Sequence, residues 1–161
     1  MAPPLPIRVE HRIGVLTPAQ PIWDLIMDVG RWGEWNPLYT KASGKVGFDE
    51  KLRLTVAIPG EQPREITPTI VDWTPNEQII WRLSMLGGLI RSTRYIETET
   101  LENGNCIFSN GELFEGPAMR LIGKKQQRAI KRGFAAFGEA VRDRAEAAWN
   151  AAHPDATSAS A

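Results

Sequence analysis

The longest stretch with one hydrophobic period begins near residue 117, and it restricts the folds open to this chain. Before that point, apart from one short helical segment, apolar and polar residues alternate in short runs, as in strands with one buried face. From Pro117 to Trp149, apolar residues instead recur every three or four positions, which predicts one long amphipathic helix. Such a helix is on the order of 45 Å long. We therefore expect a sheet with one long C-terminal helix laid across it.

Seven strands are predicted before that helix. The clearest runs from Ile7 to Val15, where His11 shares the apolar face and the residues between are Arg, Glu or Gly. Short turns join most of the strands, and Asn103-Gly104 is a strong hairpin signal, so the sheet should be antiparallel. The other six strands are expected at Tyr39 to Ser43, Lys51 to Ile58, Arg64 to Trp73, Glu77 to Met85, Thr93 to Leu101 and Cys106 to Glu115.

A short helical region is predicted after the first strand. Thr17-Pro18-Ala19-Gln20 has the pattern of a capping box, so a helix should begin near Pro18. Its apolar stripe leads into a corner that carries Trp23, Trp32 and Trp35 and that Asn36-Pro37 ends. Three tryptophans at one corner between helix and strand indicate that a large apolar surface is covered there. We expect Trp23 and Trp32 to serve packing.

The order of these elements resembles the START-like (SRPBCC) superfamily, and within it the polyketide cyclase/dehydrase group. The resemblance also includes the corner from Trp32 to Pro37, the inward-facing Trp81 and the entry Phe114-Glu115-Gly116-Pro117 into the last helix. It implies an α+β helix-grip fold, in which a curved seven-stranded antiparallel sheet wraps around a long C-terminal helix, with two short helices after the first strand. Proteins of this kind hold a hydrophobic ligand between sheet and helix.

Composition excludes several classes of function. The 161 residues are 42% hydrophobic and carry 19 basic and 19 acidic side chains, so a net charge of zero gives no reason to expect nucleic acid as a partner. Cys106 is the only cysteine, which excludes an internal disulfide and a cysteine zinc cluster; we expect no metal and no cofactor. We predict one START-like ligand-binding domain, residues 1–150, followed by a disordered tail, residues 151–161.

Location and assembly are predicted as follows. The start of the chain has no basic region followed by an apolar run, and no stretch approaches the roughly 20 apolar residues of a membrane span. We therefore expect a cytoplasmic protein without stable membrane insertion, as a monomer or a homodimer. The basic run from Lys124 to Arg132 suits either contact with an acidic membrane surface or an ordinary solvated helix face.

A sheet that curves away from a helix leaves a wedge for an apolar guest, and the predicted faces say which side chains line it. Each of these residues is equally compatible with ordinary core packing. Two polar members, Asn110 and Gln126, would offer amide groups to the ligand. The predicted lining is Trp35, Leu54, Val56, Ile70, Trp81, Leu83, Phe108, Asn110, Phe114, Met119, Ile122, Gln126, Phe134 and Phe137.

His11 and Glu112 are the candidate catalytic residues. The family topology places the strand Cys106 to Glu115 beside the first strand, which would bring these two side chains together as a general base for an enolisable substrate. Alternatively, His11 is a core histidine and Glu112 reaches solvent at the rim. Arg91 and Arg94 are expected either at the entrance, facing an anionic group, or as exposed cations paired with Glu97 or Glu99.

The chain contains none of the common phosphate-binding, dinucleotide, zinc-protease or nucleophile-elbow motifs. Three hypotheses remain. The protein is a carrier or sensor for a small hydrophobic ligand such as a lipid, polyketide or aromatic metabolite; an aromatase/cyclase-like enzyme; or an interaction protein whose cavity has collapsed.

Overall fold

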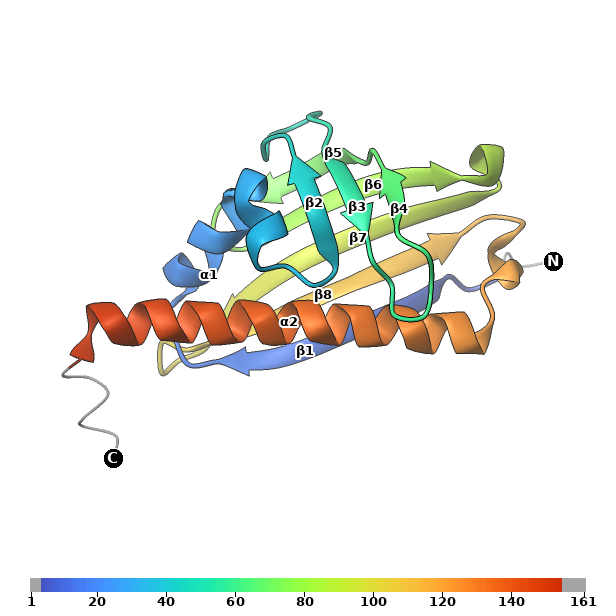
Figure 1. The fold of residues 1–161 in the computed structure, drawn as a ribbon. Coiled ribbons are helices and arrows are strands. Elements are labelled where there is room, and N and C mark those ends of the chain that lie inside the picture. Colours follow the sequence, from blue (N-terminus) through green and yellow to red (C-terminus); the bar gives the residue numbers. More distant parts are fainter. Residues whose placement is uncertain (1–3, 155–161) are drawn as a thin grey trace.

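The computed structural model describes residues 4–154 and has an α+β architecture (Figure 1). Eight strands, two α-helices and three short 3-10 helices alternate along this part of the chain. In order they are β1 (Ile7–Val15), α1 (Ala19–Met27), η1 (Val29–Glu34), β2 (Tyr39–Ser43), β3 (Arg53–Val56), β4 (Arg64–Ile66), β5 (Thr69–Thr74), β6 (Gln78–Met85), η2 (Leu86–Gly88), β7 (Ile90–Thr100), β8 (Cys106–Glu115), η3 (Met119–Leu121) and α2 (Lys124–Ala152).

The strands form two antiparallel sheets, and the long helix packs mainly on β1 and β8 of the larger one. The larger sheet has the order β1-β8-β7-β6-β5 and the smaller one has the order β2-β3-β4. Figure 1 shows α2 running along the length of the larger sheet, with α1 and η1 at its C-terminal end. At about 1.5 Å per residue, its 29 residues extend over roughly 44 Å. This is the predicted helix-grip fold.

The register of the larger sheet decides which side chains face α2. β1 and β8 pair without a break from Ile7 opposite Phe114 to Val15 opposite Cys106. The predicted neighbourhood of these two strands is therefore confirmed, and Trp81 on β6 points inward as expected, with 2% of its surface exposed. Because β7 and β8 also pair along their whole length, residues opposite each other on these strands lie on the same face of the sheet.

The strand count is eight because one predicted strand is divided. The expected strand from Arg64 to Trp73 is interrupted at Thr67-Pro68, and its halves join different sheets, β4 pairing with β3 and β5 with β6. Proline has no N–H group for a ladder hydrogen bond, so Pro68 marks the point where the chain leaves one sheet for the other.

The helix boundaries also differ from the prediction. The long helix begins at Lys124 instead of Pro117, after η3 and an extended residue at Ile122. The capping box does not form, since the Thr17 hydroxyl donates to the Pro18 carbonyl (2.8 Å) and Gln20 donates to Asp24. The long helix reaches Ala152, so the first residues of the predicted tail are helical, and residues 155–161 lie outside the described part of the chain.

The core is organised around the ring of Phe137 on α2. Its centroid lies 5.6 Å from that of Phe108, 5.9 Å from that of Tyr39 and 6.4 Å from that of Trp32. These rings come from β8, β2 and η1, so one side chain joins the helix to both sheets and to the tryptophan corner. Trp23 and Trp32 are buried, as predicted. Within residues 4–154, no helix is both long and apolar enough to cross a membrane.

The central position of Phe137 gives a first prediction. We expect Phe137→Ala to lower the free energy of unfolding by about 3 to 5 kcal/mol, because it removes a fully buried ring and leaves a cavity. Phe48→Ala, at a ring that is 76% exposed, should change it by less than about 0.5 kcal/mol. Urea unfolding of both variants checks this, and equal effects would contradict the central role of Phe137.

Candidate functional site

A small cavity of about 30 Å³ lies between the larger sheet, the smaller sheet and α2. That volume accommodates one or two water molecules, so a ligand must widen the space before it can bind. Most of the wall is apolar, with a polar side formed by Arg64, Ser92, Arg94 and Glu112. The apolar and aromatic part consists of Leu38, Tyr39, Val56, Ile58, Ile66, Trp81, Leu83, Met85, Phe114, Ile130 and Phe134.

Arg94 is the most unusual residue of this wall, because only 2% of its surface is exposed. Its Nε donates to the Tyr39 hydroxyl (2.9 Å) and its Nη2 to Asn110 Oδ1 (2.8 Å). Its Nη1 donates to the carbonyl oxygens of Tyr95 (2.9 Å) and Gly111 (3.1 Å). The guanidinium carbon also lies 4.0 Å from the centre of the Phe134 ring, a cation–π distance. The buried charge is thus held by hydrogen bonds and an aromatic face.

Asn110 connects this arginine to the helix. While its Oδ1 accepts from Arg94, its Nδ2 donates to the Phe134 carbonyl of α2 (3.2 Å). Asn110 thus links β7, β8 and α2, and its role as a ligand contact stays a prediction. Burial raises the pKa of the Tyr39 hydroxyl, and the charge of Arg94 opposes that shift.

Glu112 lies directly opposite Arg94 in the register of β7 and β8. Its Oε2 accepts a hydrogen bond from the Ser92 hydroxyl (2.8 Å). Burial raises the pKa of the Glu112 carboxyl, although the charge of Arg94, the Ser92 hydrogen bond and the charge of Arg64 each act to lower it. The cavity wall therefore holds a carboxyl group with a raised pKa, opposite a buried arginine in the register.

His11 lies elsewhere, between β1 and α2. It pairs in register with Asn110, and a Cβ atom added to Gly138 would be 3.0 Å from its Nδ1. That nitrogen is buried without a hydrogen-bond partner among the described residues, and burial lowers the pKa of the imidazole. His11 is not part of the cavity wall and forms no ion pair with Glu112 in this structure. Only Glu112 of the two candidates is in the site.

Five of the predicted lining residues form the cavity wall: Val56, Trp81, Leu83, Phe114 and Phe134. Seven others are buried around it without lining it: Leu54, Ile70, Phe108, Asn110, Met119, Ile122 and Phe137. Gln126 is partly buried on α2. Trp35 is also partly buried, stacks on Phe137 with centroids 6.2 Å apart, and lies in a different pocket.

Ser92, Arg94 and Tyr39 were not predicted as wall residues. The expectation that Arg94 is an exposed cation paired with Glu97 or Glu99 is wrong, because it is buried and donates to Tyr39, Asn110 and two backbone carbonyls. That it meets an anionic ligand group stays a prediction. The sequence contained one signal: Arg94 and Ile96 are two residues apart on a strand and so share a face, and an isoleucine indicates a buried face. Ile96 is fully buried in the structure. Arg91, in contrast, is exposed.

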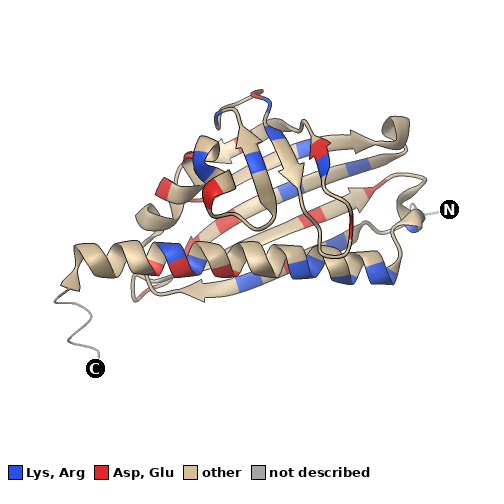
Figure 2. Ribbon diagram, viewed as in Figure 1, with Lys and Arg blue, Asp and Glu red and all other residues tan. Residues whose placement is uncertain are grey.

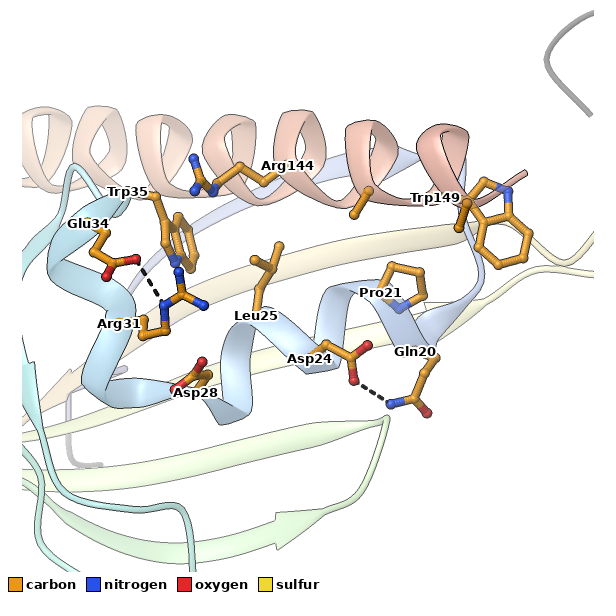
Figure 3. A pocket seen from close by; sticks show the side chains of 12 residues that line it. Gln20, Pro21, Asp24, Leu25, Asp28, Arg31, Glu34, Trp35, Arg144 and Trp149 are labelled. Atoms are coloured by element: carbon orange, nitrogen blue, oxygen red, sulfur yellow. Dashed lines mark hydrogen bonds and ion pairs between the residues drawn. The ribbon is translucent and has the colours of Figure 1, made fainter. Parts of the chain in front are cut away.

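A second, larger pocket of about 530 Å³ opens on the surface between α1, η1 and α2 (Figure 3). Trp35, Leu25 and Trp149 provide apolar walls, and charged side chains provide the rim. Two of the rim interactions are drawn as dashed lines, Gln20 to Asp24 (2.7 Å) and Arg31 to Glu34 (3.0 Å). No residue lines both this pocket and the interior cavity, so the two are separate.

Comparison with known families agrees with this architecture. The profile of the family described as "Polyketide cyclase / dehydrase and lipid transport" matches residues 6–146. The chain belongs to this family. No curated protein sequence is similar enough to this chain to count as a match.

Solved structures show the same fold at low sequence identity. The ZhuI aromatase/cyclase from Streptomyces sp. R1128 has a TM-score of 0.72 and 21% identity, over 92% of this chain and 98% of that one. A START superfamily protein from Mycobacterium smegmatis has a TM-score of 0.69 and 17% identity, over 86% and 97%. A point mutant of norcoclaurine synthase from Thalictrum flavum has a TM-score of 0.65 and 15% identity, over 90% and 97%.

The raised pKa of Glu112 predicts a pH-dependent loss of stability. Between the ordinary glutamate pKa of about 4.3 and the raised value, the folded protein binds more protons than the unfolded chain. Stability therefore falls as the pH rises through that window, and Glu112→Gln should remove this fall. Urea unfolding across a pH series, with the exposed Glu61→Gln as control, measures the difference. A Glu112→Gln profile parallel to that of the unsubstituted protein would contradict the assignment.

Proposed function

We propose that this protein binds a small, mostly apolar molecule with at least one polar oxygen between its sheets and α2, acting as a cytoplasmic carrier or sensor. The observation that carries the proposal is the polar group of Ser92, Arg94 and Glu112 in the wall of an otherwise apolar cavity. Apolar walls with a few fixed polar groups are typical of small-molecule sites.

The polar side of the cavity has capacity for a ligand. A guanidinium group has five N–H donors, and the described residues accept four hydrogen bonds from Arg94. The remaining Nη2 proton suits a carbonyl, phenolate or carboxylate oxygen of a ligand. Glu112, bonded to Ser92 through one oxygen, retains a second oxygen for a ligand hydroxyl.

Binding requires the smaller sheet to move away from α2. Residues 57–63, which connect β3 and β4, lie over the helix, where Ile58 and Pro59 are close to Gly133 (Figure 1). β4 has three residues and pairs only with β3. A hairpin with so few partners opens at low cost. At ~25 cal/mol per Å², a guest burying roughly 300 Å² of apolar surface gains about 7 kcal/mol before the costs of ordering and opening.

A second candidate function is an enzyme that moves a proton during aldol cyclisation or dehydration. The specific observation in its favour is Glu112, a carboxyl with a raised pKa beside Arg94 in the cavity wall. Such a group takes a proton from an enolisable carbon while the arginine holds the developing enolate oxygen. Structural neighbours named as an aromatase/cyclase and a norcoclaurine synthase support this candidate only through the shared fold.

Filling the cavity should abolish binding. We expect Leu83→Trp to weaken binding of 1-anilinonaphthalene-8-sulfonate, an aromatic anion, by at least about tenfold, because the larger side chain occupies the ligand's space. Leu16→Trp, at an exposed position outside the cavity wall, should bind as the unsubstituted protein does. Fluorescence titration gives the affinities, and thermal unfolding confirms that both variants fold. Equal affinities, or no probe binding and no co-purified molecule in native mass spectrometry, would favour the collapsed-cavity hypothesis.

Glu112→Gln separates the carrier from the enzyme. Once native mass spectrometry gives the mass of a co-purified ligand, turnover of that compound should fall on the order of a hundredfold or more if Glu112 moves the proton. A carrier retains its affinity with a modest change and shows no turnover in either form. His11→Ala is the matched control, since His11 lies outside the cavity wall, and an equal loss in that variant would remove Glu112 from the proposed role.

A further inference from the structure

Three exposed leucines lie at one end of the molecule, and we refer to them as the leucine tip. Leu86 is 57% exposed, Leu89 is 51% exposed and Leu121 is 72% exposed. They belong to the η2 turn and to η3, which are brought together where the Ala118 N–H donates to the Leu89 carbonyl (3.1 Å). In Figure 1, both turns lie at the end of the sheet where α2 begins.

The backbone of the leucine tip is strained in a way that presents Leu86 to solvent. Leu86 has a φ of 52°, and Gly87 and Gly88 follow with φ values of 66° and 95°. Side chains other than glycine rarely occupy this left-handed region, and such strain is concentrated at functional positions. A leucine held there, outside the core, gives no packing energy in return for its strain.

Positive charge follows the leucine tip along the chain, on η3 and the start of α2. Between Glu115 and Glu139 the sequence contains six basic residues and no acidic one: Arg120, Lys124, Lys125, Arg128, Lys131 and Arg132. All six are exposed, and none forms an ion pair with another described residue. Five of them lie on α2 and Arg120 lies in η3. Figure 2 shows basic residues in the N-terminal half of α2 and acidic residues only further along the helix.

The positive charge at the start of α2 does not stabilise the helix. The N-terminus of a helix favours acidic side chains, whereas the first turn of α2 carries Lys124 and Lys125 and has no acidic residue. The whole chain has equal numbers of basic and acidic residues, so the basic cluster is a local separation of charge. Glu115, opposite Arg91 in the register, is the nearest acidic residue before it along the chain.

We infer that this end of the molecule docks on the surface of an anionic lipid bilayer. Exposed leucines insert among the head groups and upper acyl chains, while a collar of lysine and arginine is attracted by the negative surface potential. An anionic bilayer has an apolar interior beneath a negative surface, so it matches the exposed leucines and the basic residues together. The contact is peripheral, and it does not depend on whether the cavity binds a ligand.

Co-sedimentation with vesicles tests the inference. The protein should bind vesicles of two parts phosphatidylcholine to one part phosphatidylserine, should bind pure phosphatidylcholine far less, and should be released by salt. At about fivefold per charge, Lys124→Gln with Lys125→Gln should weaken binding about thirtyfold. Leu86→Ser with Leu121→Ser should weaken it on the order of tenfold or more, because apolar burial is lost.

Two controls match these variants. Lys41→Gln with Lys51→Gln removes two exposed lysines on other elements, and Phe48→Ser removes an exposed apolar ring from the loop between β2 and β3. Both should bind vesicles as the unsubstituted protein does, and thermal unfolding should be similar for all four variants. The inference is wrong if the protein does not bind anionic vesicles, or if the control variants lose as much affinity for them as the lysine and leucine variants. It is also wrong if the leucine variant binds normally while single-stranded RNA competes, since the site would then recognise any polyanion.

Discussion

The structure depends on the contact of one ring, Phe137, with aromatic side chains from both sheets. Because Phe108, Tyr39 and Trp32 approach it from three different elements, α2 is fixed at the middle of its length. Around this point the interior is filled by rings. Towards the N-terminus of α2, Arg94 and Asn110 connect the larger sheet to the helix, and the small cavity lies beside them. The ring of Phe137 thus lies between a fully packed aromatic core and the candidate ligand site.

Arg94 imposes a cost that the fold does not require. Replacing a buried charged group by an apolar side chain of similar volume is often neutral or stabilising, so a core at this position has no need of a guanidinium. The structure offsets the cost with four hydrogen bonds and the face of Phe134. Glu112, in register beside it, lies in the same wall. The proposed ligand, by contacting both groups, would account for a buried arginine and a carboxyl side by side in this wall.

Hydrophobic periodicity in the sequence predicted the position of the main strands and which of their side chains face inward. Ile7 to Val15 and Cys106 to Glu115 have the predicted bounds. Alternation defines the first of these strands, the Asn103-Gly104 turn precedes the second, and alternation also predicted that Trp81 faces inward. It did not reveal Pro68 as a change of sheet, since strand periodicity does not say which partner a strand takes. The prediction for Arg94 was wrong because its charge suggested contact with solvent, whereas its position in the strand alternation suggested the interior. The size of the cavity depends on how rings from distant elements meet, which no local pattern records.

The proposed docking surface and the cavity are connected through the same strands. Met85 and Phe114 line the cavity, and Met85 directly precedes Leu86 of the leucine tip. β7 begins next to Leu89 and carries Ser92 and Arg94 into the cavity within five residues. A bilayer contact at the leucine tip therefore acts on the backbone that forms the wall.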